Sequence, residues 1–237
     1  MKILGLITAR GGSKRLPKKN IKNFLGKPLI AWSIDVGLKS KSFDRFILST
    51  DDEQIAKIGR DYGIDVPFLR PAEYAKDDSS SFEPIKHAVD WMRKNNNFKT
   101  DWVIVLEPPS PGRQPHHINE VINIIKSKKG ITSVVGITEV PGHISYLKQL
   151  NYVNGSVVRS FDNEMVKNLI HRNQDISKSY YINSAIYAYS VNNFYCEIKP
   201  NLWGDNTYGY IMDSKYSMDI DNQEEWDLAE IKMRQLL

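Results

Sequence analysis

The sequence predicts an α/β fold in which a mostly parallel sheet lies between two layers of helices. Short apolar segments rich in β-branched residues alternate with longer segments whose apolar side chains recur at helical spacing, as in repeated βαβ units. The chain has 237 residues, of which 41% are hydrophobic. That size and composition suit one domain, residues 1–237, with one sizeable core.

The expected elements alternate regularly up to residue 137. Strands are expected at residues 3–7, 44–50, 65–69, 102–106 and 132–137. Helices are expected at residues 29–36, 53–63, 82–95 and 117–126. Pro28 suits a first helical turn, Gly63 an αL cap, and Ser80 with Glu83 a capping box. The strand at 102–106 is apolar throughout, which indicates a central position.

Between residues 139 and 179 this alternation stops. The segment is polar, rich in Asn, Asp and Lys, and too long for a plain connection. We therefore expect a lid or a dimerisation segment there. Strands at 180–187 and 208–212 and an amphipathic helix at 222–236 complete the expected elements.

The loop after the first strand is the strongest candidate for a binding site. Two adjacent glycines, Gly11 and Gly12, free the backbone for positive φ or for close approach to a ligand. Five cations surround them within ten residues: Arg10, Lys14, Arg15, Lys18 and Lys19. Backbone N–H groups ringed by positive charge favour phosphate. The spacing matches neither common phosphate fingerprint, and a basic surface loop is the alternative.

Two further polar loops are expected at the same edge of the sheet, because the carboxyl ends of parallel strands lie together. They are the approach to Ser79–Ser81 and the segment Glu107–Arg113. Asp219 and Asp221 form a fourth candidate, since alternate residues of an extended chain share a face. Paired carboxylates suit Mg²⁺. Alternatively, Asp221 could cap the last helix.

Charge and composition exclude several classes of protein. The net charge is +4, and we find no basic stripe interleaved with aromatic residues, so nucleic acid is not an expected partner. No apolar run approaches the length of a transmembrane helix, and no leader segment precedes the first strand. Cys196 is the single cysteine, which excludes an internal disulfide. We expect a cytoplasmic protein without a membrane partner.

Several segments resemble, in matching order, motifs of the acylneuraminate (CMP-sialic acid synthetase-like) cytidylyltransferases. Residues 9–20 match A-R-G-G-S-K-R-x-P-x-K-N nearly letter for letter. Similar matches occur at 69–75 (L-R-P-A-E-x-A), 77–81 (D-x-[SA]-S-S), 172–175 (R-x-Q-[DL]), 183–187 (N-G-A-I-Y) and 219–221 (D-x-D). The resemblance spans essentially the whole chain and is weak only at 139–170.

The resemblance implies a Rossmann-like nucleotidyltransferase fold, a dimerisation excursion at 139–179 and a homodimer. It implies transfer of CMP from CTP to the anomeric hydroxyl of a 2-keto sugar acid of the sialic, legionaminic or pseudaminic type, with Mg²⁺. No Ser or Cys nucleophile is expected, because the acceptor attacks phosphorus directly.

It also implies the roles of individual residues. The expected catalytic residues are Arg10, Lys19, Asp219 and Asp221, and the two aspartates are also the expected metal ligands. The expected nucleotide-binding residues are Arg10, Gly11, Gly12, Ser13, Lys14, Lys19, Asn20, Arg70, Ser80 and Ser81. The expected substrate-binding residues are Glu107, Ser110, Arg113, Arg172, Gln174, Asn183 and Tyr187.

The sequence departs from the family pattern at two positions. Glu107 stands where the family usually has glutamine, and Ser184 where glycine is common. A glutamate lacks the amide donor and repels a nearby carboxylate, which favours a changed acceptor over a benign substitution. The alternatives are another nucleotide, a sugar phosphate or octulosonate acceptor, or a non-catalytic nucleotide-binding protein of the same fold.

Overall fold

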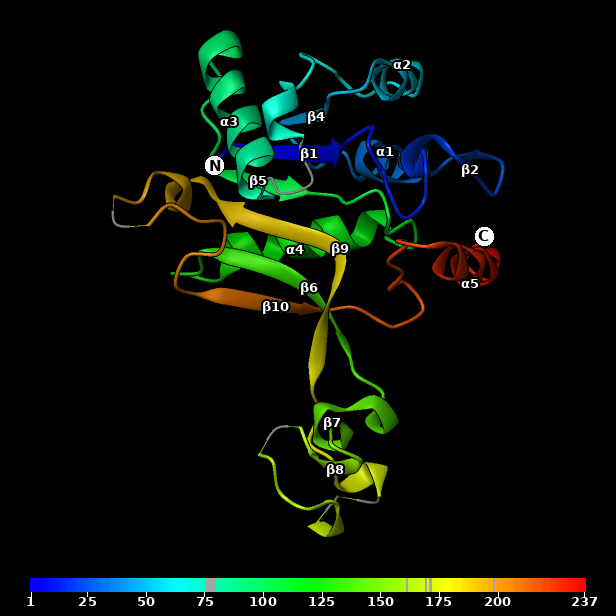
Figure 1. Cartoon of the computed structure of the whole chain (residues 1–237). Coiled ribbons are helices and arrows are strands. Elements are labelled where there is room, and N and C mark those ends of the chain that lie inside the picture. Colours follow the sequence, from blue (N-terminus) through cyan, green and yellow to red (C-terminus); the bar gives the residue numbers. More distant parts are fainter. Residues whose placement is uncertain (76–79, 161, 169, 171, 198) are drawn as a thin grey trace.

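The computed structural model describes residues 1–75, 80–160, 162–168, 170, 172–197 and 199–237. Within them, six strands form a central sheet in the order β10-β6-β9-β5-β1-β4, with helices on both faces (Figure 1). The strands are β1 (Ile3–Ala9), β4 (Arg45–Thr50), β5 (Trp102–Val105), β6 (Ser133–Glu139), β9 (Tyr180–Ser190) and β10 (Thr207–Ile211). The helices are α1 (Leu29–Ser40), α2 (Glu53–Asp61), α3 (Phe82–Asn96), α4 (Pro115–Ser127) and α5 (Gln223–Arg234).

The prediction of a mostly parallel sheet is confirmed, with one exception. β1 pairs in parallel with β4 and β5, and β10 pairs in parallel with β6. β9 runs antiparallel to both β5 and β6. No crossover helix occurs among the described residues of 140–179, so the chain returns directly alongside β6, and such a connection produces antiparallel pairing.

Each face of the sheet buries its own apolar layer. Ile30 and Ile34 of α1 and Ile118 of α4 belong to the cluster on one face. Ile85 and Met92 of α3 belong to the cluster on the other face. β5 contributes to both, and three of its four residues are buried, as expected for the central apolar strand.

A third, smaller cluster lies at the end of the molecule that carries the C-terminus. Trp226 of α5 packs edge-on against Phe24, with ring centroids 5.0 Å apart. Phe24 belongs to a short hairpin of β2 (Asn23–Phe24) and β3 (Lys27–Pro28) that follows the basic loop. This packing fixes the chain just after Asp221 beside the loop that follows β1.

Two local predictions are wrong. Residues 65–69 form only isolated parallel bridges, Ile47 to Asp65 and Thr50 to Leu69, because Pro67 has no N–H to continue a ladder. The N-cap of α3 is Ser81 rather than Ser80, and its side chain makes no capping hydrogen bond. Pro84 then occupies the N3 position, where a capping box needs Glu or Gln.

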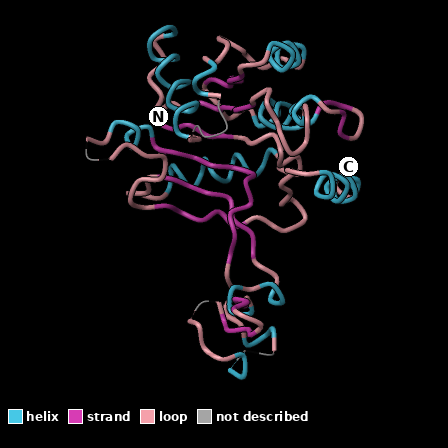
Figure 2. The backbone as a smooth tube through the Cα atoms, in the orientation of Figure 1, coloured by secondary structure: helices cyan, strands magenta, loops and turns pink. Residues whose placement is uncertain are grey.

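The described residues of 140–179, here called the arm, project away from the sheet on the extended ends of β6 and β9 (Figures 1 and 2). The arm contains an antiparallel pair, β7 (Leu150–Val153) and β8 (Ser156–Arg159). It exposes several large apolar side chains: Ile144, Tyr146, Leu150, Tyr152, Val153, Val157 and Met165. In the described part of the chain, no helix is long and apolar enough to span a bilayer.

Candidate functional site

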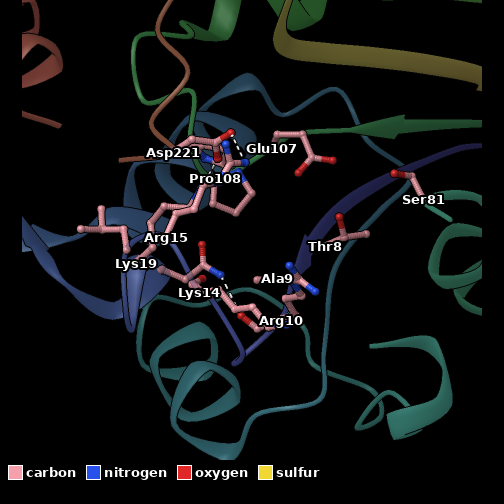
Figure 3. Close-up of a pocket in the computed structure, with 14 residues that line it drawn as sticks. Thr8, Ala9, Arg10, Lys14, Arg15, Lys19, Ser81, Glu107, Pro108 and Asp221 are labelled. Atoms are coloured by element: carbon pink, nitrogen blue, oxygen red, sulfur yellow. Dashed lines mark hydrogen bonds and ion pairs between the residues drawn. The ribbon is translucent and has the colours of Figure 1, made fainter. Parts of the chain in front are cut away.

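A pocket of about 420 Å³ opens where β1 and β5 end, and we call it the basic pocket. Its cations are Arg10, Lys14, Arg15 and Lys19, all from the loop after β1. Figure 3 shows Arg10 on one side of this space and Glu107 and Asp221 on the other. The sequence prediction that the loops after β1 and β5 meet here agrees with this arrangement.

The loop after β1 is anchored by hydrogen bonds at two points. The backbone N–H of Gly11 donates to Asp51 Oδ1 (3.2 Å), and Asn20 Nδ2 donates to the backbone oxygen of Arg10 (3.1 Å). Asn20 is buried, and its amide therefore holds the end of the loop against the start of the loop at Arg10. Arg70 pairs at 3.3 Å with the same Asp51 that accepts from Gly11, and burial lowers the pKa of Arg70.

The two glycines of the loop have different environments. Neither has a positive φ, contrary to one of the two possibilities drawn from the sequence. A Cβ on Gly11 would lie 2.6 Å from Asp52 Oδ2, whereas a Cβ on Gly12 would meet no atom within 4 Å. Gly11 is therefore required for close approach to Asp52, which caps α2 by accepting from the N–H groups of Gln54 and Ile55.

We expect Gly11→Ala to destabilise the protein by about 1–2 kcal/mol, because the new methyl displaces the Asp52 side chain and a lost N-cap costs about that much. Gly12→Ala is the matched control and should stay near the wild-type stability. Urea denaturation of both variants measures the difference. Equal stability of the two would contradict the close packing of Gly11 against Asp52.

Lys19 and Asp221 form the best-defined polar contact of the basic pocket. Lys19 Nζ donates to Asp221 Oδ1 (2.9 Å) and to the backbone oxygen of Ile220 (2.6 Å). Arg15 Nη2 donates to Asp221 Oδ2 (2.7 Å). Burial opposes ionisation of Asp221, but the hydrogen bond from Lys19 and the charges of Lys19 and Arg15 hold its pKa below the usual value.

Asp221 does not cap the last helix. Asn222 is the N-cap of α5, and it forms a capping box with Glu225. The side chain of Asp221 therefore serves no helix end, and it faces the basic pocket. The alternative interpretation of Asp221 from the sequence is wrong.

A second pocket of about 660 Å³, here called the aromatic pocket, adjoins the first. Ser81, Glu107 and Pro109 line both pockets. Asp219 lines the aromatic pocket, whereas Asp221 lines the basic one, so the two aspartates stand on either side of the junction. Burial raises the pKa of Asp219, and the negative charge of Asp221 adds to this shift.

Glu107 lies at the junction and has an unusual environment for a carboxylate. Burial raises its pKa to about 7 against the attraction of Arg113, and the charge of Asp219 also favours the protonated form. The hydroxyl of Thr8 donates a hydrogen bond to it. Glu107 can therefore hold or release a proton near neutral pH between the two pockets.

Ser184 occupies a backbone position that suits glycine. Its φ is 56°, in the left-handed region that side chains other than those of Gly, Asn and Asp rarely adopt. Its hydroxyl hydrogen-bonds with the carboxylate of Asp219 and accepts from the hydroxyl of Tyr187 (3.5 Å). The strained position thus places a serine hydroxyl in the aromatic pocket, where the family pattern has no side chain.

Three of the expected substrate-binding residues lie under the pockets instead of lining them. Arg113 is 1% exposed, with a pKa that burial lowers to about 9. It donates to Ser33 Oγ (2.6 Å) and to the backbone oxygens of Glu107 (3.3 Å) and Ala185. Asn183 is buried against Thr138 and Ser217, and Ser110 is fully buried. These side chains support the backbone from which Glu107 and Ser184 project.

The remaining expected residues divide between the pockets and the arm. Ser80, Ser81 and Tyr187 line the aromatic pocket, and Ser13 and Lys14 line the basic one. Arg172 and Gln174 are exposed on the arm and line neither pocket. Asp77 and Ser79 lie outside the described residues. Tyr189 and Trp203 line the aromatic pocket and were missed, because neither belongs to a recognisable polar motif.

Comparison with known proteins identifies the family of this chain. Residues 4–225 match the family model described as cytidylyltransferase. The chain belongs to the cytidylyltransferase family. The enzyme class expected from the sequence, a nucleotidyltransferase, is thereby confirmed.

Three curated relatives illustrate the range of the family. An N-acylneuraminate cytidylyltransferase of Escherichia coli is 34% identical over 96% of this chain, which spans only about half (51%) of that relative. A pseudaminic acid cytidylyltransferase of Campylobacter jejuni is 30% identical over 98% of this chain and 96% of its own length. A CMP-N,N'-diacetyllegionaminic acid synthase of Legionella pneumophila is 34% identical over 97% of this chain and 95% of its own length.

Solved structures share the fold. A CMP:2-keto-3-deoxy-manno-octonic acid synthetase complexed with CTP has a TM-score of 0.73 at 17% identity, with both chains covered completely. A cytidylyltransferase from Leptospira borgpetersenii has a TM-score of 0.62 at 16% identity, covering 100% of this chain and 88% of its own. The Rossmann-like nucleotidyltransferase fold expected from the sequence is confirmed.

Proposed function

We propose that the protein transfers CMP from CTP to the anomeric hydroxyl of a 2-keto nonulosonic acid and releases pyrophosphate. The relatives are named for sialic, pseudaminic and legionaminic acids, and we assign the acceptor to this class of sugar acids. The observation that carries the proposal is the junction of the two pockets at Ser81, Glu107 and Pro109, with Asp221 on one side and Asp219 on the other.

In this proposal the basic pocket holds the triphosphate. Arg10, Lys14, Arg15 and Lys19 supply positive charge, and the hydroxyl of Ser13 can donate a hydrogen bond to a phosphate oxygen. The cytosine lies toward Ser81, where the basic pocket meets the aromatic pocket. The acceptor occupies the aromatic pocket, so that its anomeric hydroxyl faces the α-phosphate at the junction.

The transfer then needs no covalent intermediate. The anomeric oxygen forms a bond to the α-phosphorus as the bond from that phosphorus to the β-phosphate oxygen breaks, and pyrophosphate leaves. Lys19 and Arg10 stabilise the charge that develops on the leaving group. The hydroxyl proton passes to the carboxylate of Asp219, which lines the aromatic pocket.

The pair Asp219 and Asp221 fits Mg²⁺. No group of three or more potential ligands occurs among the described residues, so an all-protein metal cage is not available. Mg²⁺ is commonly held by one or two carboxylates together with substrate phosphates and water. Burial and, to a smaller extent, the negative charge of Asp221 raise the pKa of Asp219, and a cation beside the two carboxylates would offset the second of these effects. When bound, the ion would neutralise phosphate charge and acidify the attacking hydroxyl.

The aromatic pocket disfavours the alternative of a sugar phosphate acceptor. Among its described lining residues there is no Lys, Arg or His, whereas Glu107 and Asp219 are both acidic. The two negative charges of a sugar phosphate would be repelled there more strongly than the single negative charge of a sugar acid. A non-catalytic nucleotide-binding role is likewise disfavoured, since such a protein has no use for the two carboxylates at the junction.

We expect CTP alone among the four nucleoside triphosphates to protect the protein against heat. A ligand at about 100 times its dissociation constant stabilises by roughly 2.7 kcal/mol. We further expect release of pyrophosphate from CTP and Mg²⁺ with at least one member of a panel of 2-keto nonulosonic acids. Protection by CTP without release on any acid would mean that the acceptor class is wrong. Equal protection by all four nucleotides would exclude a specific CTP site.

We also propose that residues 1–237 form a single nucleotidyltransferase domain and that the protein is cytoplasmic. We further propose that the arm mediates a homodimer. The arm exposes Tyr152 (77%), Val153 (54%) and Met165 (65%), and a second copy could cover such side chains. Arg172 and Gln174, which line neither pocket of their own chain, could then reach the partner's site. Gel filtration should give twice the monomer mass of 27.2 kDa, and elution at the monomer mass would contradict the proposal.

A further inference from the structure

Asp219 and Asp221 are carried by residues 216–221, here called the carboxylate segment, which belong to no helix or strand. The segment lies on the connection between β10 and α5 (Figure 1). A strand is held in place by its ladder of hydrogen bonds, whereas an irregular segment depends on individual contacts. The positions of the two carboxylates are therefore set by what the carboxylate segment touches.

Gly112, in the loop after β5, makes a contact with this segment that leaves no room for a side chain. A Cβ on Gly112 would lie 2.5 Å from the backbone oxygen of Tyr216 and 3.1 Å from Met218 Cε. Gly112 is buried, and its φ is not in the left-handed region. Alanine could adopt the same backbone conformation, so only the contact with the carboxylate segment requires a glycine here.

The backbone of Ile220, between the two aspartates, is held from two directions. Its N–H donates to the backbone oxygen of Pro109 (3.0 Å), which belongs to the same loop as Gly112. Its backbone oxygen accepts from Lys19 Nζ (2.6 Å), in the loop after β1. The side chain of Ile220 is fully buried in the third cluster, together with Leu16 of that loop. The carboxylate segment thus joins the two loops that form the basic pocket.

The start of the carboxylate segment is also held, on the side away from the loop after β5. The ring of Tyr216 packs edge-on against the buried ring of His117 in α4, with centroids 4.8 Å apart. Ser217 Oγ accepts a hydrogen bond from Asn183 Nδ2 (3.2 Å), in β9. The segment therefore cannot simply swing outward to make space for a larger residue at position 112.

A side chain at Gly112 would act on the aspartates through the backbone. The Tyr216 oxygen would have to move by roughly 1 Å before it reached an ordinary contact distance. Because Tyr216 is held by α4 and Ile220 by two loops, the residues between them would take up the displacement. Asp219 lies in this interval, and its carboxylate would move relative to the basic pocket.

We propose that Gly112 is a positioning residue, which fixes Asp219 and Asp221 by admitting the carboxylate segment directly against the loop after β5. Gly112 lines neither pocket, so it acts only through the two aspartates. The carboxylates are then in place before a ligand arrives. This inference rests on the proposed function, because it takes the pair as the group that holds Mg²⁺ beside the triphosphate.

Gly112→Ala tests the proposal. We expect kcat to fall by about 100-fold, as for a misplacement of about 1 Å at a reacting centre. KM for CTP should stay within about twofold of wild type, because the cations of the basic pocket come from the loop after β1. In wild type, CTP with Mg²⁺ should raise the melting temperature more than CTP alone. Gly112→Ala should keep the shift with CTP alone and lose most of the additional shift with Mg²⁺.

Gly5→Ala is the matched control. A Cβ on Gly5 would lie 2.6 Å from the ring of Phe43, and Gly5 is likewise buried without a positive φ. Gly5 lines neither pocket, so this variant should lower the melting temperature but keep kcat and the Mg²⁺ shift near the wild-type values. If Gly112→Ala also loses stability alone, Gly112 has a merely structural role and the inference is overturned.

Hydrogen exchange of the Ile220 amide provides a readout that needs neither turnover nor metal. Because this amide donates to Pro109, it should exchange slowly in wild-type protein without added ligands. In Gly112→Ala it should exchange at least about 10-fold faster. Exchange in wild type as fast as that of an unstructured peptide would show that the segment is not docked, and it would overturn the inference even if Gly112→Ala fails to fold.

The outcomes separate this inference from the proposed function. If wild type binds CTP and Mg²⁺ but releases no pyrophosphate with any nonulosonic acid, the proposed function is wrong, and the Mg²⁺ shift and the exchange of the Ile220 amide still decide the role of Gly112. If wild type turns over and Gly112→Ala has the same kcat and the same Mg²⁺ shift, the role of Gly112 is wrong and the proposed function stands.

Discussion

Asp221→Ala is expected to lower kcat/KM by about 10³-fold, the scale of losing one preorganised electrostatic group at a reacting phosphate. Asp221 lies in the basic pocket, accepts from Lys19 and Arg15, and faces Asp219 across the junction. Its removal leaves one carboxylate to hold a cation and releases Lys19 from its fixed position. Initial rates of pyrophosphate release with CTP, Mg²⁺ and the preferred acid measure the loss.

The fold should survive this change. The Asp221 side chain is 35% exposed, and ion pairs of that exposure contribute little to stability, typically below about 1 kcal/mol. Protection by CTP without Mg²⁺ should persist or increase, because a negative charge is removed beside the triphosphate site. Asp221→Asn retains the side-chain shape, and it should be similarly inactive if the charge is what matters.

Asp213→Ala provides the matched control. Asp213 lies on the same connection between β10 and α5, pairs with Lys215, and lines neither pocket. Its loss should leave kcat/KM near the wild-type value. Turnover of Asp221→Ala at a comparable rate would show that the metal and catalytic assignments of this aspartate are wrong.

Much of this site could be predicted from the sequence because its signals are local. An apolar strand followed by two glycines and five cations predicts an anion-binding loop from a short stretch of sequence. The alternation of Asp219 and Asp221 depends only on extended backbone. Since the fold then joins these segments at one sheet edge, Lys19 reaches Asp221 although 202 positions separate them.

The parts that could not be predicted depend on tertiary packing. Arg113 follows a strand end and carries a charge, so it was expected to bind substrate, yet its side chain turns inward to backbone oxygens, among them that of Ala185. The sequence of β9 also does not reveal whether the strand is parallel or antiparallel to its neighbours, because alternating side chains give the same pattern in both directions. The N-cap of α5 is Asn222, one residue after the cap that the alternative interpretation assigned, so the side chain of Asp221 is available to the basic pocket.

Glu107→Gln is expected to change how stability depends on pH. The pKa of Glu107 is about 7 in the folded protein, against an ordinary value of 4.5. The folded state therefore binds the proton more tightly than the unfolded state, and the resulting stability is present below pH 4.5 and is lost as the pH rises through 7. Glutamine has no such proton, so the variant should lack this loss.

Relative to wild type, Glu107→Gln should thus gain stability between pH 4.5 and 7, by up to about 3 kcal/mol at pH 8. Urea denaturation at several pH values, with a chelator and without CTP, measures the difference. Glu197→Gln, at an exposed position, is the control and should follow the wild type at every pH. Free energies of unfolding for Glu107→Gln that run parallel to the wild type would show that Glu107 is not desolvated.

This pH dependence bears on the reaction because Glu107 lies between the two pockets. A neutral Glu107 donates a hydrogen bond, as a glutamine amide would, whereas an ionised one only accepts. If desolvation holds the proton near neutral pH, the glutamate can take the place of the family's glutamine toward an acceptor oxygen. The natural glutamate then retains a hydrogen-bond donor and adds a group that can release a proton. The variant Glu107→Gln should therefore keep turnover, and its pH–rate profile should lack any ionisation of Glu107.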